Sequence, residues 1–247
     1  MTEIPWSWRR APGTRPLVLA HRGGTGPWHE NTLDAFAGAL HAGADGVELD
    51  VRRSADGELI VHHDAEVAGT GLVHELRRDQ IPAWAPTLGR ALAACAGAVV
   101  NVEVKNVPTD PGYDPGNRVS ADVAAVLAAG AGSTEPWPAH VMVSSFWPDA
   151  LAAVRGAPRT TSLGLLVHPA FDALSALDTA TDLGCVALNP HHSQVSAELV
   201  SRAHALDVAV VTWTVNSPED LDNVLGAEVD VVITDSVADT LAHLGRL

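Results

Sequence analysis

Strand-like and helix-like segments alternate along almost the whole chain, and this alternation limits the possible folds more than any other feature. The strand-like segments are short, apolar and rich in β-branched residues, at 17–21, 46–51, 99–105, 140–146, 162–167, 185–189, 208–215 and 229–234. The helix-like segments are rich in Ala and Leu, at 32–42, 87–96, 121–129, 149–155, 173–183, 197–206, 218–225 and 237–244. Strands separated by helices pair in parallel, and eight such units in ~250 residues are typical of a (β/α)8 TIM barrel. The sequence therefore predicts this α/β fold.

Two segments interrupt the alternation. After the second strand, a tight-turn sequence at 55–57 and a strand-like run at 58–63 predict a hairpin extension. Residues 65–86 have no clear period, so we expect an insertion over about 55–86 at the end of the barrel that carries the active site. The Pro/Gly-rich stretch 106–117 predicts a long loop after the third strand. The expected organisation is an N-terminal arm over 1–15 and a single barrel domain over 16–247.

Cap residues mark the start of several helices. Asn31 precedes the helix-like run that begins at Thr32, and Ser217 precedes Pro218. Both residue types are favoured as N-caps, because their side-chain oxygens accept hydrogen bonds from free backbone N–H groups. We therefore expect Asn31 and Ser217 to be N-caps.

Composition excludes several classes of partner. The net charge is −15 and the pI is about 5.0, which disfavours nucleic acid and anionic lipid, since their binding depends on Lys and Arg. No apolar run approaches the ~18 residues that a membrane span needs, and the N-terminus has no apolar core of a signal peptide. The sequence thus predicts a cytoplasmic protein without stable membrane association. Cys95 and Cys185 are expected to be buried thiols.

Charged side chains occur on strands where apolar ones would be expected. Side chains alternate along a strand, so Glu48 and Asp50 share one face, and Glu103 and Lys105 share one face of the next strand. Facing into the barrel, the three carboxylates would repel one another unless a cation neutralised them. Hard oxygen ligands favour Mg²⁺, Ca²⁺ or Mn²⁺ over Zn²⁺. The alternative is that these residues form ordinary surface ion pairs at frayed strand ends.

Two histidines follow strands and are candidates for acid–base chemistry. His21 ends the first strand and is followed by Arg22 and two glycines, while His63 ends the hairpin run beside Asp64. Near a metal, such a pair suits phosphodiester cleavage, because one imidazole accepts a proton from the nucleophile and the other protonates the leaving alkoxide. Arg22 and Lys105 are expected to bind the non-bridging phosphate oxygens.

Short motifs follow one another in a specific order along the chain. They read His21-Arg22-Gly23, Glu30-Asn31-Thr32, Glu48-Leu49-Asp50, His63-Asp64 and Glu103-Val104-Lys105, then Ser144-Ser145-Phe146, Trp213-Thr214-Val215-Asn216 and Ile233-Thr234-Asp235. In this order they resemble the glycerophosphodiester phosphodiesterase family over nearly the whole chain after the arm.

The resemblance implies a (β/α)8 barrel with a small insertion after strand two, and a set of site residues. These are metal ligands at Glu48, Asp50 and Glu103, catalytic histidines at His21 and His63, and substrate-binding residues at Arg22, Lys105 and Trp213. Glu30 is expected to lie close enough to the ligands to join them directly or through water. Trp28 and Trp147, like Trp213, are expected at the barrel mouth, where they either stack on a head group or pack the loops.

The expected activity is metal-dependent hydrolysis of a small-molecule glycerophosphodiester to glycerol 3-phosphate and an alcohol. The cofactor is a divalent cation, Mg²⁺ or Ca²⁺, with Mn²⁺ as a further choice. One alternative is a phospholipase C- or D-like lipid phosphodiesterase on the same barrel. Another is a non-catalytic protein that binds phosphodiesters. The sequence leaves the head group, the order of attack by hydroxyl or water, and the oligomeric state open.

Overall fold

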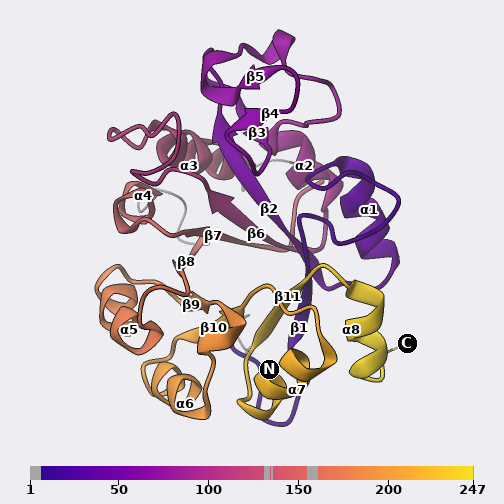
Figure 1. Ribbon diagram of the computed structural model, residues 1–247, viewed down its shortest axis with the longest axis vertical. Coiled ribbons are helices and arrows are strands. Elements are labelled where there is room, and N and C mark those ends of the chain that lie inside the picture. The colour runs from indigo at the N-terminus through magenta and orange to yellow at the C-terminus, as the bar shows by residue number, and fades with distance from the viewer. Residues whose placement is uncertain (1–6, 131–133, 135, 155–160, 247) are drawn as a thin grey trace.

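Eight parallel strands close into a barrel surrounded by helices (Figure 1). The computed structural model describes residues 7–130, 134, 136–154 and 161–246. The barrel strands are β1 (Leu17–His21), β2 (Gly46–Arg53), β6 (Val99–Val104), β7 (His140–Ser145), β8 (Ser162–Val167), β9 (Ala187–Pro190), β10 (Ala209–Thr212) and β11 (Val231–Thr234). Because β1 pairs with both β11 and β2, the eight barrel strands form a closed ring. The predicted (β/α)8 TIM barrel is confirmed.

The helices follow the strands as the sequence predicts. They are α1 (Leu33–His41), α2 (Leu88–Ala94), α3 (Arg118–Gly130), α4 (Pro148–Val154), α5 (Ala173–Asp182), α6 (Ala197–Ala205), α7 (Pro218–Gly226) and α8 (Val237–His243). The end predicted for the fourth helix at residue 155, and residues 1–6 of the arm, lie outside the described residues. In the described part of the chain, no helix is both long and apolar enough for a membrane crossing.

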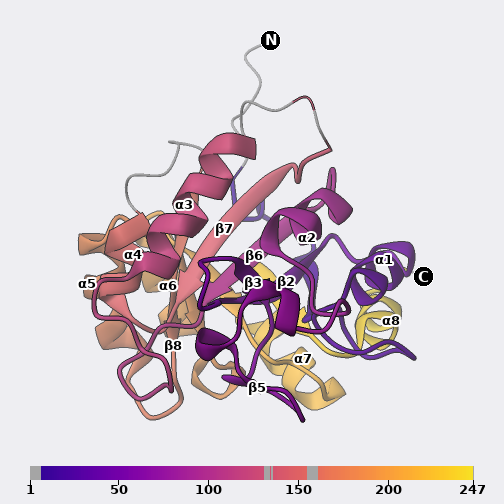
Figure 2. The same ribbon diagram turned by 90° about the horizontal axis from the view of Figure 1, so that it is seen from above.

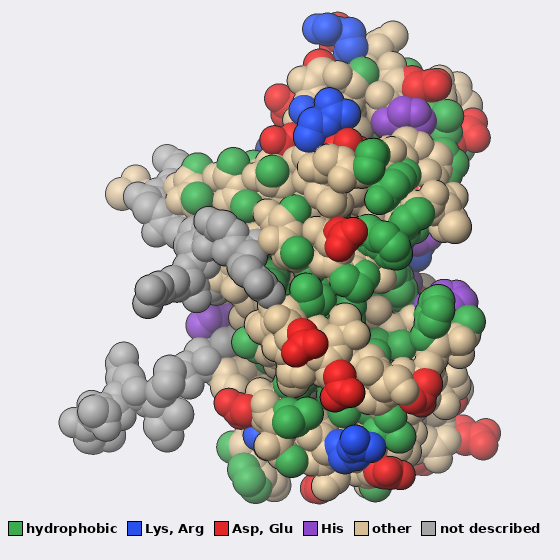
Figure 3. All heavy atoms as spheres, turned by 90° about the vertical axis from the view of Figure 1, so that its left-hand side faces the viewer, with side chains coloured by type: hydrophobic (Ala, Val, Ile, Leu, Met, Phe, Trp, Pro, Cys, Tyr) green, Lys and Arg blue, Asp and Glu red, His purple; other side chains and the backbone are tan. Residues whose placement is uncertain are grey.

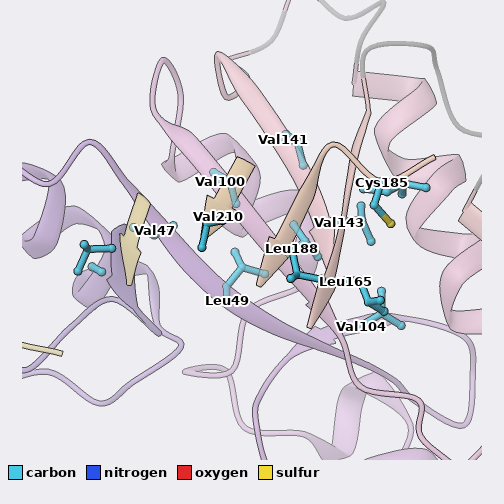
Figure 4. Packing of buried hydrophobic residues seen from close by; sticks show 14 of the residues in the cluster. Val47, Leu49, Val100, Val104, Val141, Val143, Leu165, Cys185, Leu188 and Val210 are labelled. Carbon is cyan, nitrogen blue, oxygen red and sulfur yellow. The ribbon is translucent and has the colours of Figure 1, made fainter. Parts of the chain in front are cut away.

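Alternation along the strands divides the core into two layers. Outward side chains such as Val47, Leu49 and Val100 pack against the helices, as Figure 4 shows for part of this layer. Inward side chains form a smaller cluster inside the barrel, which includes Leu19 and Met142. Since β-strand side chains alternate faces, each strand contributes to both layers. Cys95 and Cys185 are buried free thiols, as predicted.

The N-terminal arm covers the end of the barrel where the strands begin, which we call the floor. Trp8 is only 3% exposed and packs in the inner cluster with Val99, Ala187 and Ala209. These are the first residues of β6, β9 and β10. The backbone N–H of Arg10 donates to the buried carboxylate of Asp230 at 3.0 Å. The described part of the arm, residues 7–15, is therefore irregular, as expected, and it also contributes to the core.

The insertion after β2 lies at the opposite end, where the strands finish, which we call the mouth (Figure 2). Strand β3 (Leu59–Val61) pairs antiparallel with β2, which confirms the predicted hairpin. The remainder holds the short strands β4 (Glu66–Val67) and β5 (Gly71–Leu72) and the 3₁₀ turns η1 (Val73–Glu75) and η2 (Arg78–Gln80). It has a small apolar core of its own, built from Ile60, Val67, Val73, Ile81 and Ala85.

The two predicted caps had different outcomes. Ser217 is the N-cap of α7, and its side chain accepts from the Asp220 N–H, as expected. The N-cap of α1 is Thr32 rather than Asn31, because the Thr32 hydroxyl accepts from the Ala35 N–H. The prediction for Asn31 is wrong, since this residue has φ +57° and directs its side chain into the barrel mouth.

Candidate active site

Three acidic side chains converge at the mouth. Glu48 and Asp50 come from β2 and Glu103 comes from β6, where Asp50 and Glu103 are register partners. Each offers a carboxylate oxygen within 4.8 Å of the others. Glu48 and Asp50 are buried and Glu103 is nearly so, which rules out surface ion pairs at frayed strand ends. The prediction that these side chains share one interior face is confirmed.

Two basic side chains partly neutralise this acidic group. The Lys105 Nζ lies 2.8 Å from Glu103 Oε1 and 3.4 Å from Asp50 Oδ1. The Arg22 Nε lies 3.4 Å from Asp50 Oδ2. Burial raises the pKa of Asp50, but the charges of Lys105, His63 and Arg22 outweigh it and hold the pKa below its usual value. Asp50 is therefore the ionised centre of the group.

Glu48 is only partly compensated, because the charge of His21 and the Arg22 backbone N–H do not outweigh the effects that raise its pKa. Burial, followed by repulsion from Asp50, raises the pKa of Glu48 to about 8. Its Oε2 accepts one hydrogen bond, from the Arg22 backbone N–H at 3.1 Å. Asn101 is the register partner of Glu48 and Ser144 that of Glu103, and the side-chain oxygens of both are buried without a hydrogen-bond partner among the described residues. Carboxylates whose negative charge is only partly neutralised, together with polar oxygens that lack partners, fit a divalent cation. Such a cation favours ionised oxygen ligands.

Asn31 orients Asp50. Its Nδ2 donates to Asp50 Oδ2 at 2.9 Å, and its Oδ1 accepts from the Asp50 backbone N–H at 3.3 Å. Asn31 is fully buried, and asparagine tolerates the left-handed conformation that this position requires. The sequence analysis did not predict this role, although Asn31 is part of the Glu30-Asn31-Thr32 motif.

His21 lies next to Glu48 in the strand register and is held by a carboxylate. Its Nδ1 lies 2.7 Å from Asp235 Oδ1, and Asn216 Nδ2 donates to the other Asp235 oxygen at 2.6 Å. Burial lowers the pKa of His21, but the hydrogen bond to Asp235 and the charge of Glu48 outweigh it, so the pKa is raised. With Nδ1 bound to the carboxylate, Nε2 is the nitrogen left for a substrate. The positions of Asp235 and Asn216 were named in the motifs, but their role was not predicted.

His63 approaches the same group from the insertion side. Its Nδ1 lies 2.7 Å from Asp64 Oδ1, and its imidazole is about one-third exposed. Its charge helps to lower the pKa of Asp50, so the structure brings the second predicted histidine to the acidic group. The two imidazoles therefore approach the carboxylates from β1 and from the end of β3.

Glu30 lies at the edge of the site rather than among the three converging carboxylates. Its two oxygens lie 3.1 and 3.2 Å from Arg22 Nη1. The carboxylate is 44% exposed, against 1% for Asp50. Glu30 therefore neutralises Arg22 on the solvent side of the site.

Trp213 lies at the mouth, just beyond the end of β10. The predicted strand ran to residue 215, whereas β10 ends at Thr212. Its Nε1–H donates to the Asn189 carbonyl at 2.9 Å. Its ring meets Phe146 at 5.5 Å and His191 at 5.2 Å between centroids, both edge to face. Trp147, which was also expected at the mouth, packs against the outer layer of the core. This favours its alternative role, packing a loop, over stacking on a head group.

Two cavities flank the site. A polar one of about 470 Å³ lies beside Lys105 and is lined by Arg52, Arg53 and residues of the loop before α3. An apolar one of about 820 Å³ lies between α4 and α5 and includes Phe146 and Phe171. Figure 3 views the molecule from the side of α4 and α5, and hydrophobic side chains lie across the middle of this view.

The acidic group, both histidines and the basic side chains all lie at the mouth. In (β/α)8 barrels, active sites occupy this end, formed by the loops that follow the strands. The fold and the site therefore place the chain in the class of barrel enzymes with an acidic site at the strand ends.

The sequence profile of the "Glycerophosphoryl diester phosphodiesterase family" matches residues 21–239, and the chain belongs to this family of enzymes. A glycerophosphodiester phosphodiesterase of Caldanaerobacter subterraneus subsp. tengcongensis is 29% identical, covering 94% of this chain and 98% of that protein. A putative glycerophosphoryl diester phosphodiesterase from Silicibacter pomeroyi has a TM-score of 0.81 at 25% identity, covering 96% of this chain and 95% of that one.

A further structural likeness concerns the fold. An Oleispira antarctica phosphodiesterase, solved in complex with the product sn-glycerol-3-phosphate, has a TM-score of 0.79 at 24% identity. The likeness covers 93% of this chain and 97% of that chain.

Proposed function

We propose that this chain hydrolyses glycerophosphodiesters to glycerol 3-phosphate and an alcohol, with a divalent cation held by Glu48, Asp50 and Glu103. The observation that carries the proposal is the convergence of three carboxylates within 4.8 Å, next to two imidazoles. All-oxygen ligands favour Mg²⁺, Ca²⁺ or Mn²⁺. When bound, such a cation supplies Lewis acidity to a phosphate oxygen and to the attacking hydroxyl.

The two histidines divide the proton transfers. His21 accepts the proton of the nucleophile at Nε2, and Asp235 stabilises the resulting imidazolium through Nδ1. His63 donates a proton to the departing alkoxide. The nucleophile is either the neighbouring glycerol hydroxyl, which gives a cyclic phosphate that water then opens, or water itself.

The basic and aromatic residues bind the substrate. Arg22 and Lys105 lie beside the acidic group, so they are placed to hold the non-bridging phosphate oxygens and to offset charge in the transition state. Trp213, which is held rigidly by its ring contacts and its hydrogen bond, borders the substrate.

The proposal is tested with metal-free protein and histidine variants. Chelation with EDTA should abolish release of glycerol 3-phosphate from glycerophosphocholine, and one of the three cations should restore it. His21→Ala and His63→Ala should each lower kcat by ~10²- to 10⁴-fold. His243→Ala is the control, because His243 forms a similar pair with Asp222 away from the site. Near-normal turnover by either site variant, or by the chelated protein, would refute the scheme.

A second candidate, a lipid phosphodiesterase, is favoured by the apolar cavity. This cavity shares Phe146 with the surroundings of Trp213, and Phe171 at its edge is 69% exposed. Comparing short-chain lysophosphatidylcholine with glycerophosphocholine separates the two functions. Higher kcat/KM for the acylated substrate would make the lipid the better assignment.

A further inference from the structure

Arg52 lies one step beyond the acidic group on the same face of β2. Glu48, Asp50 and Arg52 alternate with the outward-facing apolar residues of this strand. The Arg52 side chain is only 9% exposed. Arg52 forms no ion pair with the site residues described above. Its contacts elsewhere therefore suggest its role.

The guanidinium joins two segments that are distant in sequence. Its Nε donates to the backbone carbonyl of His63 at 2.8 Å, and its Nη2 donates to Asp110 Oδ2 at 3.1 Å. Asp110 belongs to the loop between β6 and α3. A planar guanidinium with donors on two edges fixes both partners in one geometry, which a lysine ammonium does not do.

His63 has few other anchors. The ladder between β2 and β3 ends at Val61, and the following N–H, of His62, donates to the Asp50 carbonyl at 3.1 Å. Beyond it, the His63 imidazole is held by Asp64, which is 74% exposed and adjacent in sequence. Among the described residues, the partly buried hydrogen bond from Arg52 is therefore the one that ties the His63 backbone to the barrel.

We propose that Arg52 is a positioning residue that holds His63 in place as the general acid, with Asp110 orienting the guanidinium. The inference rests on the proposed role of His63. A displacement of about 1 Å at a reacting group lowers rates by up to ~100-fold, so the loss of this link should appear in the proton-transfer step.

Arg53 provides a matched control. It is the next residue on β2 and lines the same polar cavity, but its Nε lies 2.6 Å from Asp122 Oδ2 on α3. Arg53 thus has the same charge, a similar position and a carboxylate partner, without the contact to His63.

The experiment compares substrates that differ in their need for a general acid. Glycerophosphocholine releases an alkoxide that must be protonated, whereas glycerophospho-p-nitrophenol releases a stabilised phenolate. The parameter is kcat/KM, which reports only steps up to departure of the alcohol. We expect Arg52→Lys to lower kcat/KM for glycerophosphocholine by ~10- to 100-fold and for the p-nitrophenyl ester by less than about threefold. Arg53→Lys should change neither substrate by more than about threefold.

Asp110→Asn provides a second route to the same result if Arg52→Lys folds poorly. Asp110 is 26% exposed in a loop, and its substitution leaves the guanidinium in place. We expect a loss of about 3- to 10-fold with glycerophosphocholine and none with the p-nitrophenyl ester. Asp122→Asn is the corresponding control and should be neutral with both.

Three outcomes overturn the inference. Equal losses on both substrates would show a general structural defect, and wild-type values for both Arg52→Lys and Asp110→Asn would show no positioning role. His63→Ala, measured in parallel, distinguishes the inference from the proposed function. If His63→Ala shows no dependence on the leaving group, then the proposed role of His63 fails and the inference fails with it.

Discussion

Asp235 and Asn216 determine which nitrogen of His21 is left for the proposed proton transfer. The carboxylate binds Nδ1, and the Asn216 amide holds the carboxylate from the other side, donating to its Oδ2 and accepting the Asp235 backbone N–H at 2.9 Å. A neutral amide in place of Asp235 no longer selects the Nδ1–H tautomer and does not stabilise the imidazolium.

Asp235→Asn should therefore lower kcat by on the order of 10²- to 10⁴-fold with little change in KM. The melting temperature should stay within a few degrees of wild type, because the carboxylate is partly exposed. Steady-state kinetics with glycerophosphocholine measures the effect. Asp222→Asn, which changes the carboxylate that pairs with His243, should leave kcat unchanged. A change in KM with unchanged kcat for Asp235→Asn would contradict the orienting role.

Site residues on strands were predictable, and residues that act through long-range contacts were not. Glu48, Asp50 and Glu103 were found because two-residue alternation puts them on one face. In contrast, Asp235 meets His21 across 214 positions of sequence, and Arg52 meets Asp110 across 58. No local pattern specifies such partners, since they depend on barrel closure and on the path of a loop.

At the scale of elements, one asparagine organises the long loop before α3. Asn106 is 2% exposed, and its side chain makes three hydrogen bonds, with Asp114 O, the Asp114 N–H and Asn117 Oδ1, at 2.7 to 2.9 Å. This loop also carries Asp110 and borders the polar cavity beside Lys105. The loop is therefore a fixed wall of the site rather than a free connection.

Asn106→Ala should loosen this wall. Removing buried hydrogen-bond partners destabilises by about 1–3 kcal/mol for each group left unsatisfied, so cleavage within the loop in limited proteolysis should become faster. KM should rise severalfold. Thr109→Ala in the same loop is the control and should behave like wild type. Unchanged proteolysis of Asn106→Ala would show that other contacts hold the loop.

The barrel elements followed from periodicity, whereas the insertion beyond its first strand, β3, did not. Each predicted strand and helix has a counterpart in the structure, because buried parallel strands are apolar runs between Ala-rich amphipathic helices. Strands β4 and β5 have two residues each, which is too short for any period to show. Their core comes from residues as far apart as Ile60 and Ala85, so only the folded chain reveals it.

At the scale of the whole molecule, stability and chemistry lie at opposite ends of the barrel. Trp8 fills the floor, where it packs with Ala187, Ala209 and Val231, while the carboxylates and imidazoles lie at the mouth. The floor of such barrels contributes to stability and the mouth to catalysis. Substitutions at the floor should consequently change stability without changing turnover.

Trp8→Ala should reduce the free energy of unfolding by about 3–5 kcal/mol, since a large buried aromatic ring is lost. For a domain of this size the melting temperature should fall by roughly 6–20 °C. Below that temperature, kcat should match wild type. Phe171→Ala removes an exposed ring and should have a much smaller effect on melting. A Trp8→Ala protein with normal melting would show that the arm is not part of the core.

The pairing of β1 with β11 has a consequence for biosynthesis. Leu17 is the register partner of Val231, so the first strand made on the ribosome must wait for the last before the barrel closes. At about 5–20 residues per second, that interval is on the order of 10 to 50 s. Throughout it, the nascent chain carries an unpaired sheet edge, and Trp8 lacks its late-synthesised neighbours. Chaperone capture and aggregation are therefore expected to act on this chain mainly during translation, before its final strand emerges.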